Sequence, residues 1–447
     1  MSVLATVRPR GPKNPPIVGQ IPAFRSNPLG FLTRTAREFG DIAYFRLGPQ
    51  HVYLVNEPEF IRHILVTNQN NFTKSRALQR AKVLLGEGLL TSEGEAHLRQ
   101  RRLVQPAFHR PRLIGYSKMM TDYAVRTRER WRDGETLDVA SEMMRLTLAV
   151  VGKTLFSADV EAEAGEIGEA LTAILHMFDL LMMPFSEYLE KLPLPSVRRF
   201  EKARGRLDHT IYGMIAERRG GGEDRGDLLS MLLLSRDEDG SGGLSDQQVR
   251  DEALTLFLAG HETTAQTLMW TWYLLSQNPE CESRLHEEVD RVLGGRAPTF
   301  DDLPQLRYTE MVLAESMRMY PPAWAIGRKS IDAFELGGYG ISKGSILILS
   351  PYVTQRDARF FPDPERFDPE RWTPEARDTR PKFSYFPFGG GARLCIGERF
   401  AWMEGALVVA AIAQKWRLRL VSGHRVEPLP LITLRSKYGM KMTVTSR

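Results

Sequence analysis

The chain has 447 residues, of which 42% are hydrophobic and 26% charged, a balance typical of a soluble globular protein rather than a disordered or fibrous one. Its net charge of +5 is too small at this length to indicate nucleic-acid binding. No apolar run reaches the roughly 18 residues of a membrane helix, and the N-terminus lacks a signal-peptide core. We therefore expect a cytoplasmic protein that spans no membrane. With two cysteines, Cys281 and Cys395, a disulfide framework and a thiolate-rich zinc site are excluded.

The residue pattern predicts a mainly α protein with a small β region. Residues 1–30 are rich in proline and glycine and indicate an extended N-terminal arm. Two β-prone runs flank Gly48-Pro49 within residues 41–55, which predicts a hairpin. From there to about Tyr320 the pattern is helical. No internal repeat or low-complexity tract is visible, and many helices with a small β region suggest one large domain over residues 1–447.

Polar breaks and short strands complete this outline. The stretch RRGGGEDR at 218–225 is typical of a surface loop or short linker, and DEDGSGG at 237–243 is expected to be solvent-exposed. After Tyr320 the chain becomes irregular and rich in proline, with candidate strands at 346–349 and 440–444.

A long central helix is predicted over residues 246–277. Ser245 and Gln248 form a capping-box pattern at its start, and Asn278-Pro279 ends it, because the residue before proline avoids the helical region. A helix of this length spans roughly 48 Å. Its flanks are apolar nearly all round, which indicates burial.

The middle of this helix, Ala259–Thr267, is polar (AGHETTAQT). Buried polar groups require partners, so this segment is either a functional feature or a polar patch whose hydrogen bonds are satisfied locally. The segment alone leaves both possibilities open.

The most informative segment is FPFGGGARLCIG, residues 386–397. Its glycines allow positive φ angles and a close approach to a large flat group. Cys395 precedes an apolar helix, residues 400–413, and a helix start with a nearby cation stabilises a thiolate. Arg393 supplies the cation and Phe388 could shield the sulfur. An inert buried cysteine beside a tight turn is the alternative.

This segment resembles the haem-ligand loop of the cytochrome P450 family, F-x-x-G-x-R-x-C-x-G. Phe388, Gly391, Arg393, Cys395 and Gly397 fit the pattern. The resemblance implies the family's mainly α fold and a haem b whose iron is held by the Cys395 thiolate, a ligand that favours O–O cleavage.

A second resemblance is the E-x-x-R pair Glu315 and Arg318, followed by Arg366 in a Pro-Glu-Arg-Phe segment. The spacing alone means little, because Glu59 and Arg62 share it and are expected to form a surface pair. In this order along the chain, however, the family places a buried Glu–Arg–Arg cluster that fixes the haem loop. The resemblance therefore implies a structural role for Glu315, Arg318 and Arg366.

The polar helix centre resembles the family's [AG]-G-x-[DE]-T-[TS] segment. The resemblance implies that Gly260 permits a local distortion, that Thr263 hydrogen-bonds dioxygen or a water, and that Glu262 relays protons from solvent. His261 is expected to be a neutral or solvated side chain rather than a metal ligand, because adjacent helix residues do not face each other.

Four basic side chains are candidates for the haem propionates. His97 and Arg101 stand where the family has W-x-x-x-R, with His97 replacing tryptophan. Arg328 follows the Pro-Pro turn, and Arg393 lies in the cysteine loop. A solvated role for Arg328 remains an alternative.

The resemblance implies a monooxygenase that uses O2 and NAD(P)H-derived electrons to hydroxylate or epoxidise an organic substrate. No flavin or iron–sulfur segment is visible, so a ferredoxin or flavodoxin with its reductase is the expected electron donor. The rivals are a peroxygenase driven by H2O2, which the Glu262–Thr263 pair disfavours, and a non-enzymatic haem sensor or electron carrier.

The substrate is expected to be lipophilic, such as a fatty acid or terpenoid, because Met182 and Met183 suit irregular apolar ligands; a role of this Leu/Met stripe in the core is the alternative. Arg99, Arg102 and Arg399 are candidates for steering an acidic electron donor, with ordinary solvated charge as the alternative. The stretches expected to line the pocket are 75–90, 171–185, 254–259, 323–326 and 437–440.

Overall fold

The computed structural model describes residues 7–158, 192, 194–221, 224–236 and 242–447. The described chain is mainly helical with small sheets, as predicted, and its contacts divide it into two units. One unit is Met1–Gln79 with Met317–Cys395, and the other is Arg80–Ser316 with Ile396–Arg447. Among the described residues, no helix has both the length and the apolar character needed to cross a membrane.

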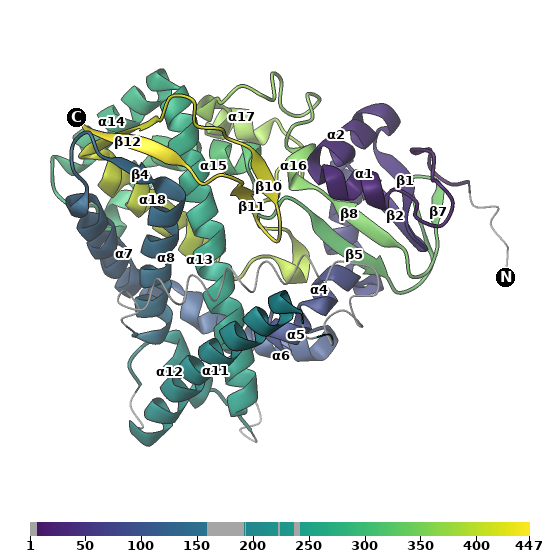
Figure 1. Cartoon of the computed structure of the whole chain (residues 1–447), viewed down its shortest axis with the longest axis horizontal. Helices are drawn as coiled ribbons and strands as arrows, with labels where there is room; N and C mark the ends of the chain where they lie inside the picture. Colours follow the sequence, from purple (N-terminus) through teal and green to yellow (C-terminus); the bar gives the residue numbers. More distant parts are fainter. Residues whose placement is uncertain (1–6, 159–191, 193, 222–223, 237–241) are drawn as a thin grey trace. The chain divides into compact units, whose positions relative to one another are not determined.

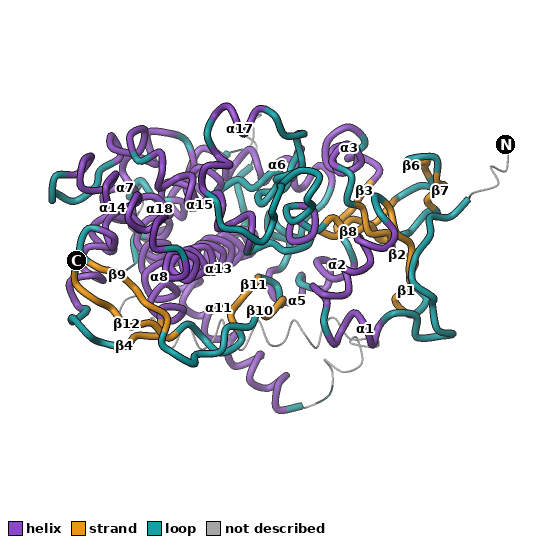
Figure 2. The backbone as a smooth tube through the Cα atoms, turned by 90° about the horizontal axis from the view of Figure 1, so that it is seen from above, coloured by secondary structure: helices purple, strands orange, loops and turns teal. Residues whose placement is uncertain are grey.

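The first unit is built on a five-stranded sheet in the order β1-β2-β8-β5-β3, whose strands β1, β2 and β8 are seen together in Figure 2. The antiparallel pair β1 and β2 confirms the predicted hairpin. Side chains alternate along β2, so Val52 and Leu54 pack with helix α2 whereas Tyr53 and Val55 face the opposite cluster. That second cluster contains Phe386, so the start of the cysteine loop is packed against the sheet.

The elements that lie wholly or mostly in the first unit, in chain order, are α1 Ile21–Ser26, α2 Pro28–Phe39, β1 Ile42–Leu47, β2 Gln50–Val55, α3 Pro58–Arg62, the π-helical turn η1 His63–Thr67, η2 Gln69–Asn71, β3 Phe72–Lys74, α4 Arg76–Arg80, β5 Ile326–Ser330, β6 Phe334–Leu336, β7 Tyr339–Ile341, β8 Ile346–Leu349, α16 Pro351–Thr354, η5 Pro369–Trp372, α17 Pro374–Asp378 and η6 Gly391–Arg393.

The second unit is a helical assembly around α13, Asp246–Gln277 (Figure 1). Both predicted ends of this helix are confirmed, and Ser245 and Gln248 form the reciprocal capping box. Helices α8, α11 and α18 pack against it, which buries α13 over most of its length. The polar centre of α13 therefore lies inside the unit rather than at its surface.

The remaining elements are α5 Lys82–Leu85, α6 Gly94–Val104, η3 Gln105–Phe108, α7 Arg110–Arg130, β4 Thr136–Asp138, α8 Val139–Phe156, α11 Pro195–Gly221, α12 Leu228–Leu234, α14 Pro279–Leu293, η4 Phe300–Gln305, α15 Arg307–Met319, α18 Glu398–Ala413, β9 Trp416–Leu420, β10 Pro428–Pro430, β11 Leu434–Ser436 and β12 Lys441–Ser446.

The prediction of an extended arm over residues 1–30 is wrong in its second half. Helix α1 lies inside this range and α2 begins at Pro28. Proline at the first turn is compatible with a helix start, because its missing N–H needs no partner there. The Asn27 side chain also caps α2 by accepting a hydrogen bond from Gly30 N at 2.9 Å.

The predicted surface loop at 218–225 is also partly wrong, because α11 continues to Gly221. Arg218 is buried and donates to both carboxylate oxygens of Asp227, at 3.1 and 2.7 Å. It also donates to Ser230 Oγ at 2.6 Å and to the Phe156 carbonyl at 3.0 Å. The guanidinium thus joins α8, α11 and α12. Most of the other predicted loop, 237–243, lies outside the described residues.

We expect Arg218→Met to lower the free energy of unfolding by about 3 kcal/mol or more, because it leaves the buried Asp227 carboxylate without its cation. Urea unfolding followed by circular dichroism measures this change. Arg219→Met is the matched control: its ion pair with Asp246 is half-exposed, so its effect should stay within about 0.5 kcal/mol. Equal effects of the two substitutions would contradict the structural role of Arg218.

Candidate functional site

Cys395 lies on a tightly folded, solvent-accessible loop. Gly389 and Gly391 adopt positive φ angles of 75° and 66°, which side-chain-bearing residues rarely adopt. A Cβ at Gly391 would lie 1.9 Å from the Leu65 carbonyl oxygen. The Cys395 N–H donates to the Phe388 carbonyl at 3.0 Å. The predicted glycine requirement therefore has a local steric cause, and the thiol is open rather than packed into the core.

The polypeptide behind this loop is held by Arg318 and Gln355, both fully buried. Arg318 donates to the carbonyls of Gln355 and Pro364 at 2.9 and 2.8 Å. The Gln355 amide donates to the carbonyls of Met317 and Arg318 at 3.0 and 3.1 Å and accepts from Phe386 N at 3.1 Å. A chain of hydrogen bonds thus links the end of α15 to the first residue of the cysteine loop.

A second amide holds the tip of the loop. Gln69, on η2, accepts a hydrogen bond from Ala392 N at 2.8 Å through its Oε1. The loop is therefore seated on η1 and η2 as well as on Gln355. Sequence reasoning missed both glutamines, because single glutamines carry no pattern that distinguishes them from surface residues.

Burial separates the predicted Glu315–Arg318 pair from other pairs with the same spacing. Glu315 and Arg318 are fully buried. Glu59 and Arg62 instead form an exposed ion pair with an N–O distance of 3.1 Å, as expected. Identical spacing thus yields a core feature in one place and a surface pair in the other.

The side chain of Arg366 is exposed, so the prediction that it joins a buried cluster is wrong. Its contribution is its main-chain carbonyl, which accepts from Arg318 at 3.1 Å. The chain carries a second Pro-Glu-Arg segment, and there Arg371 is half-buried with an inaccessible Nε. Arg371 donates to the Asp363 carbonyl at 3.0 Å. The two identical tripeptides thus differ in the burial of their arginines, which the sequence alone does not show.

The centre of α13 has an accessible stripe within an otherwise buried helix. Ala259 is exposed and Gly260 and Thr263 are half-buried, whereas His261 and Glu262 are buried. The Thr263 hydroxyl donates to the Ala259 carbonyl at 2.7 Å, a local bond that can bend a helix. Burial lowers the pKa of His261 to about 4, which supports the prediction of a neutral side chain.

Glu262 is held by the hairpin of β10 and β11. Arg435 donates to both carboxylate oxygens at 2.6 Å, and Thr433 Oγ1 donates to one of them at 2.7 Å. Burial alone would raise the pKa of Glu262, but the bonds from Arg435 outweigh it and hold the pKa below its usual value. Glu262 is therefore an ionised, paired carboxylate in this structure.

A second buried acid, Glu404 on α18, lies beside α13. Burial raises its pKa well above the usual value, and neither carboxyl oxygen has a hydrogen-bond partner within normal geometry. Burial therefore favours the protonated form of this carboxyl, in contrast to that of Glu262. A glutamate inside an apolar helix was the available sequence signal, and it was missed.

Three consecutive charged residues of α13 fix the loop that precedes α6. Asp251 Oδ2 accepts from Glu87 N at 2.9 Å, and Glu252 Oε2 accepts from Leu89 N at 3.0 Å. Arg250 donates to the Leu84 carbonyl at 3.1 Å. The end of the predicted pocket-lining stretch 75–90 is thereby tied to α13, directly before its accessible stripe.

Arg250 also reaches α11, where its Nε donates to Asp208 Oδ1 at 2.7 Å. The loop backbone leaves no room for side chains here: Gly86 has φ 61°, and a Cβ on it would lie 2.1 Å from the Asp251 carboxylate. Sequence reasoning missed this clamp, because its partners lie far apart along the chain.

The predicted propionate ligands fall in both units. His97 and Arg101 lie on α6, where His97 is buried and Arg101 half-buried. Arg328 lies on β5 and Arg393 on η6, both half-buried. Their spacing on α6 places His97 and Arg101 on one helix face.

The other predicted pocket stretches differ in outcome. Residues 171–185 lie outside the described residues. In the stretch 437–440, Lys437 is exposed and paired with Glu427 at 2.8 Å, and Met440 is fully buried. That stretch is therefore a surface turn followed by a core residue, and its exposed side chains do not line a pocket among the described residues.

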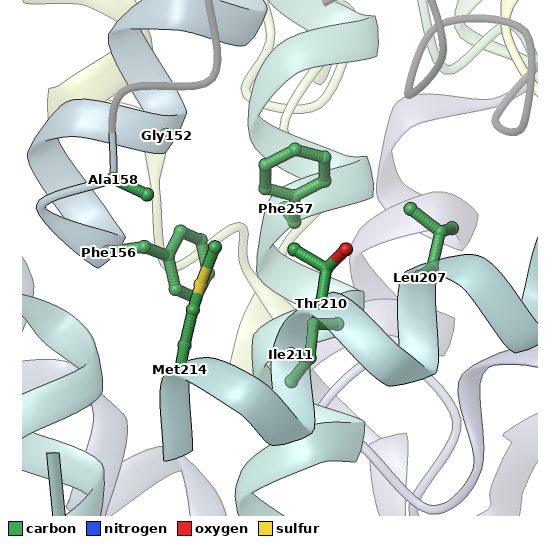
Figure 3. A pocket seen from close by; sticks show the side chains of 8 residues that line it. All are labelled: Gly152, Phe156, Ala158, Leu207, Thr210, Ile211, Met214 and Phe257. Carbon is green, nitrogen blue, oxygen red and sulfur yellow. The ribbon is translucent and has the colours of Figure 1, made fainter. Parts of the chain in front are cut away.

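An apolar pocket between α8, α11 and α13 is too small for a drug-sized ligand. Its volume is about 20 Å³, near that of one water-sized probe. Figure 3 shows Phe156, Met214 and Phe257 around it. The lining residues are Gly152, Phe156, Ala158, Leu207, Thr210, Ile211, Met214 and Phe257.

Each unit thus carries one element that a haem-thiolate site needs. The first presents an accessible thiol on a fixed, glycine-rich loop. The second presents a buried helix whose centre is accessible at Ala259, Gly260 and Thr263. The residues present fit a haem held by Cys395.

Comparison with known proteins supports the family that the cysteine loop resembles. The family model described as Cytochrome P450 matches residues 9–441. Cyclooctatin synthase of Streptomyces melanosporofaciens is 41% identical over 94% of this chain and 92% of its own length. Cyclooctat-9-en-7-ol 5-monooxygenase of the same organism is 41% identical over 92% and 90%. Pentalenene oxygenase of Streptomyces avermitilis is 37% identical over 97% and 96%.

We expect Gln355→Leu to accelerate haem loss, because it leaves Phe386 N–H and two carbonyls without a partner in the core. Transfer of haem to excess apomyoglobin, followed by absorbance, measures the rate. The matched control is Gln50→Leu, which removes an amide bonded to the Gly344 carbonyl at 2.9 Å, in the sheet of the same unit. Equal rates of haem loss in the two variants would show that Gln355 does not support the loop.

Proposed function

The chain belongs to the cytochrome P450 family and is a haem-thiolate monooxygenase acting on a lipophilic compound, and we propose that its substrate is a cyclic terpenoid. The observation that carries this proposal is the 37–41% identity, over nearly full length, to proteins named Cyclooctatin synthase, Cyclooctat-9-en-7-ol 5-monooxygenase and Pentalenene oxygenase. Hydroxylation or epoxidation is the reaction. The family match extends over both units, which supports one haem domain over residues 1–447.

Cys395 is the iron ligand in this proposal, and the cofactor is haem b. When bound, the haem supplies reductive activation of O2 and insertion of one oxygen atom into the substrate. The side chains assigned to its propionates are His97, Arg101, Arg328 and Arg393. The bonds from Gln355 and Gln69 keep the cysteine loop in a single conformation.

On α13, Thr263 is part of the accessible stripe, where it positions a water molecule as a proton donor. Its hydroxyl accepts hydrogen bonds while it donates to Ala259 O, so it can orient a water molecule there. Glu262 is the acid nearest to it in sequence, and its carboxylate is paired with Arg435.

Electrons come from a ferredoxin or flavodoxin with an NAD(P)H-dependent reductase, and the cytoplasm is the proposed compartment. Arg102 and Arg399 are exposed and suit an acidic partner. Arg99 is half-buried and lies 3.5 Å from the Gly243 carbonyl, so it is the weakest of the three candidates.

The assignment of Cys395 is tested by the absorbance of the reduced protein with CO. A thiolate ligand gives the long-wavelength band of the family, and we expect Cys395→Ser to lose it. Cys281→Ser is the matched control and should keep the band, because Cys281 lies on α14. A Cys395→Ser protein that retains the band would refute the assignment.

The substrate proposal is tested by titrating the purified holoenzyme with cyclic terpenes, terpene alcohols and fatty acids. We expect a blue shift of the main haem band with a cyclic terpene or its alcohol at micromolar concentration. With a surrogate ferredoxin and reductase, that compound should gain one oxygen atom, as measured by mass spectrometry. Oxidation of fatty acids alone would contradict the terpenoid proposal and leave the monooxygenase class intact.

A further inference from the structure

The apolar pocket of the second unit has a buried inner wall and a partly exposed outer wall. Phe156, at the end of α8, and Phe257, on α13, belong to the inner wall and are buried. Their rings meet edge to face, with centroids 5.7 Å apart. Thr210 and Met214, on α11, are half-buried and form the outer wall (Figure 3). The pocket therefore reaches from the partly exposed side of α11 to the buried side of α13.

The walls of this pocket favour a small apolar occupant over water. A buried water needs several polar partners, and among the described residues that line the pocket Thr210 alone carries a polar side chain. Apolar cavities in proteins stay dry and take up apolar guests such as xenon. The volume of about 20 Å³ admits one small guest and excludes a terpenoid. The pocket is therefore suited to an apolar gas molecule.

The inner end of the pocket lies close to the accessible stripe of α13. Phe257 precedes Gly260 by three residues, which is about 4.5 Å along the helix axis. On the facing helix α8, Gly152 lines the pocket, and its neighbour Val151 packs against Gly260. A Cβ on Gly260 would lie 3.1 Å from Val151 Cγ2. The pocket and the stripe are thus adjacent along the same two helices.

Dioxygen is the small apolar molecule that the proposed reaction consumes, and that reaction requires it at the accessible stripe of α13. Because transfer of an apolar molecule from water into apolar surroundings is favourable, an apolar pocket beside the stripe raises the local concentration of O2. We propose that the pocket is a dioxygen-binding site, which holds O2 between solvent and the accessible stripe. This inference rests on the proposed function for the identity of its ligand.

The outer wall gives this site an entrance on the side of α11. Met214 is unbranched and flexible, so its side chain can move aside for a passing molecule. Ala158, just after the end of α8, is half-buried and leaves space at the same edge of the pocket. An ordinary packing gap would have the same walls, but filling it would leave the uptake of O2 unchanged.

The first test uses xenon, an apolar gas slightly larger than O2, in pressurised crystals of the holoenzyme. We expect a xenon peak between Phe156, Thr210 and Phe257 in the natural chain. Thr210→Val should keep the peak, because it preserves the shape of the side chain and removes only the hydroxyl. Thr210→Leu extends the side chain into the pocket and should lose the peak. Ala158→Leu fills the same space from the end of α8 and serves if Thr210→Leu folds poorly.

Ala216→Leu is the matched control for both filling variants. Ala216 also lies on α11 but is exposed, so the added carbon atoms stay outside the pocket and the xenon peak should persist. A pocket of the natural chain that takes up no xenon, or that holds a water bonded to the Thr210 hydroxyl, would overturn the proposal.

The second test measures how fast O2 binds to the reduced, substrate-free holoenzyme, by stopped-flow absorbance. We expect Thr210→Leu and Ala158→Leu to slow binding about twofold or more, the change that a barrier higher by about 0.4 kcal/mol gives. Thr210→Val and Ala216→Leu should match the natural chain. Natural rates of O2 binding in both filling variants would refute the proposal even if xenon occupies the pocket.

The two proposals fail in different ways. If the reduced holoenzyme binds no O2 and oxidises no compound, the proposed function fails, while the xenon peak still shows whether the pocket takes up an apolar gas. If a terpenoid is oxidised and the filling variants bind O2 at the natural rate, the function stands and the dioxygen site does not.

Discussion

Burying charge inside α13 is the constraint on which the second unit depends. Arg250, Asp251, Glu252 and Glu262 are each at most 5% exposed, and an unpaired buried charge costs several kcal/mol. Each therefore needs a partner from another element. Asp208 of α11, the loop before α6 and the hairpin carrying Arg435 supply these partners. Because the buried charges of α13 need these partners, they fix the positions of the neighbouring segments.

The same rule applies to neutral polar groups around the cysteine loop. A loop that exposes a thiol cannot form regular ladders, so its backbone N–H groups need other acceptors. Gln355 and Gln69 accept hydrogen bonds from the N–H groups of Phe386 and Ala392. Arg318 donates hydrogen bonds to the carbonyls behind the loop. An accessible sulfur is combined in this way with an immobile backbone, which suits a metal ligand.

Two buried glutamates illustrate how environment assigns different roles to one residue type. Arg435 lowers the pKa of Glu262 and keeps it ionised, whereas burial without a cation raises the pKa of Glu404 well above its usual value. As pH rises above the ordinary carboxyl range, Glu404 therefore lowers stability, because the unfolded chain releases its proton first. Glu262 acts in the opposite sense: its stabilisation is present above that range and is lost as pH falls.

The sequence by itself determined the family, the cysteine loop and the ends of α13, because each rests on residues close together in the chain: a glycine-rich pattern, a capping box and an Asn-Pro stop. It could not identify Arg435, which lies 173 residues from Glu262, nor show that Arg366 is exposed whereas Arg371, in an identical tripeptide, is half-buried. Only the tertiary structure decided these contacts and burials. A buried charge can be paired with any donor that the fold brings within about 3 Å, and the local sequence does not determine which donor that is.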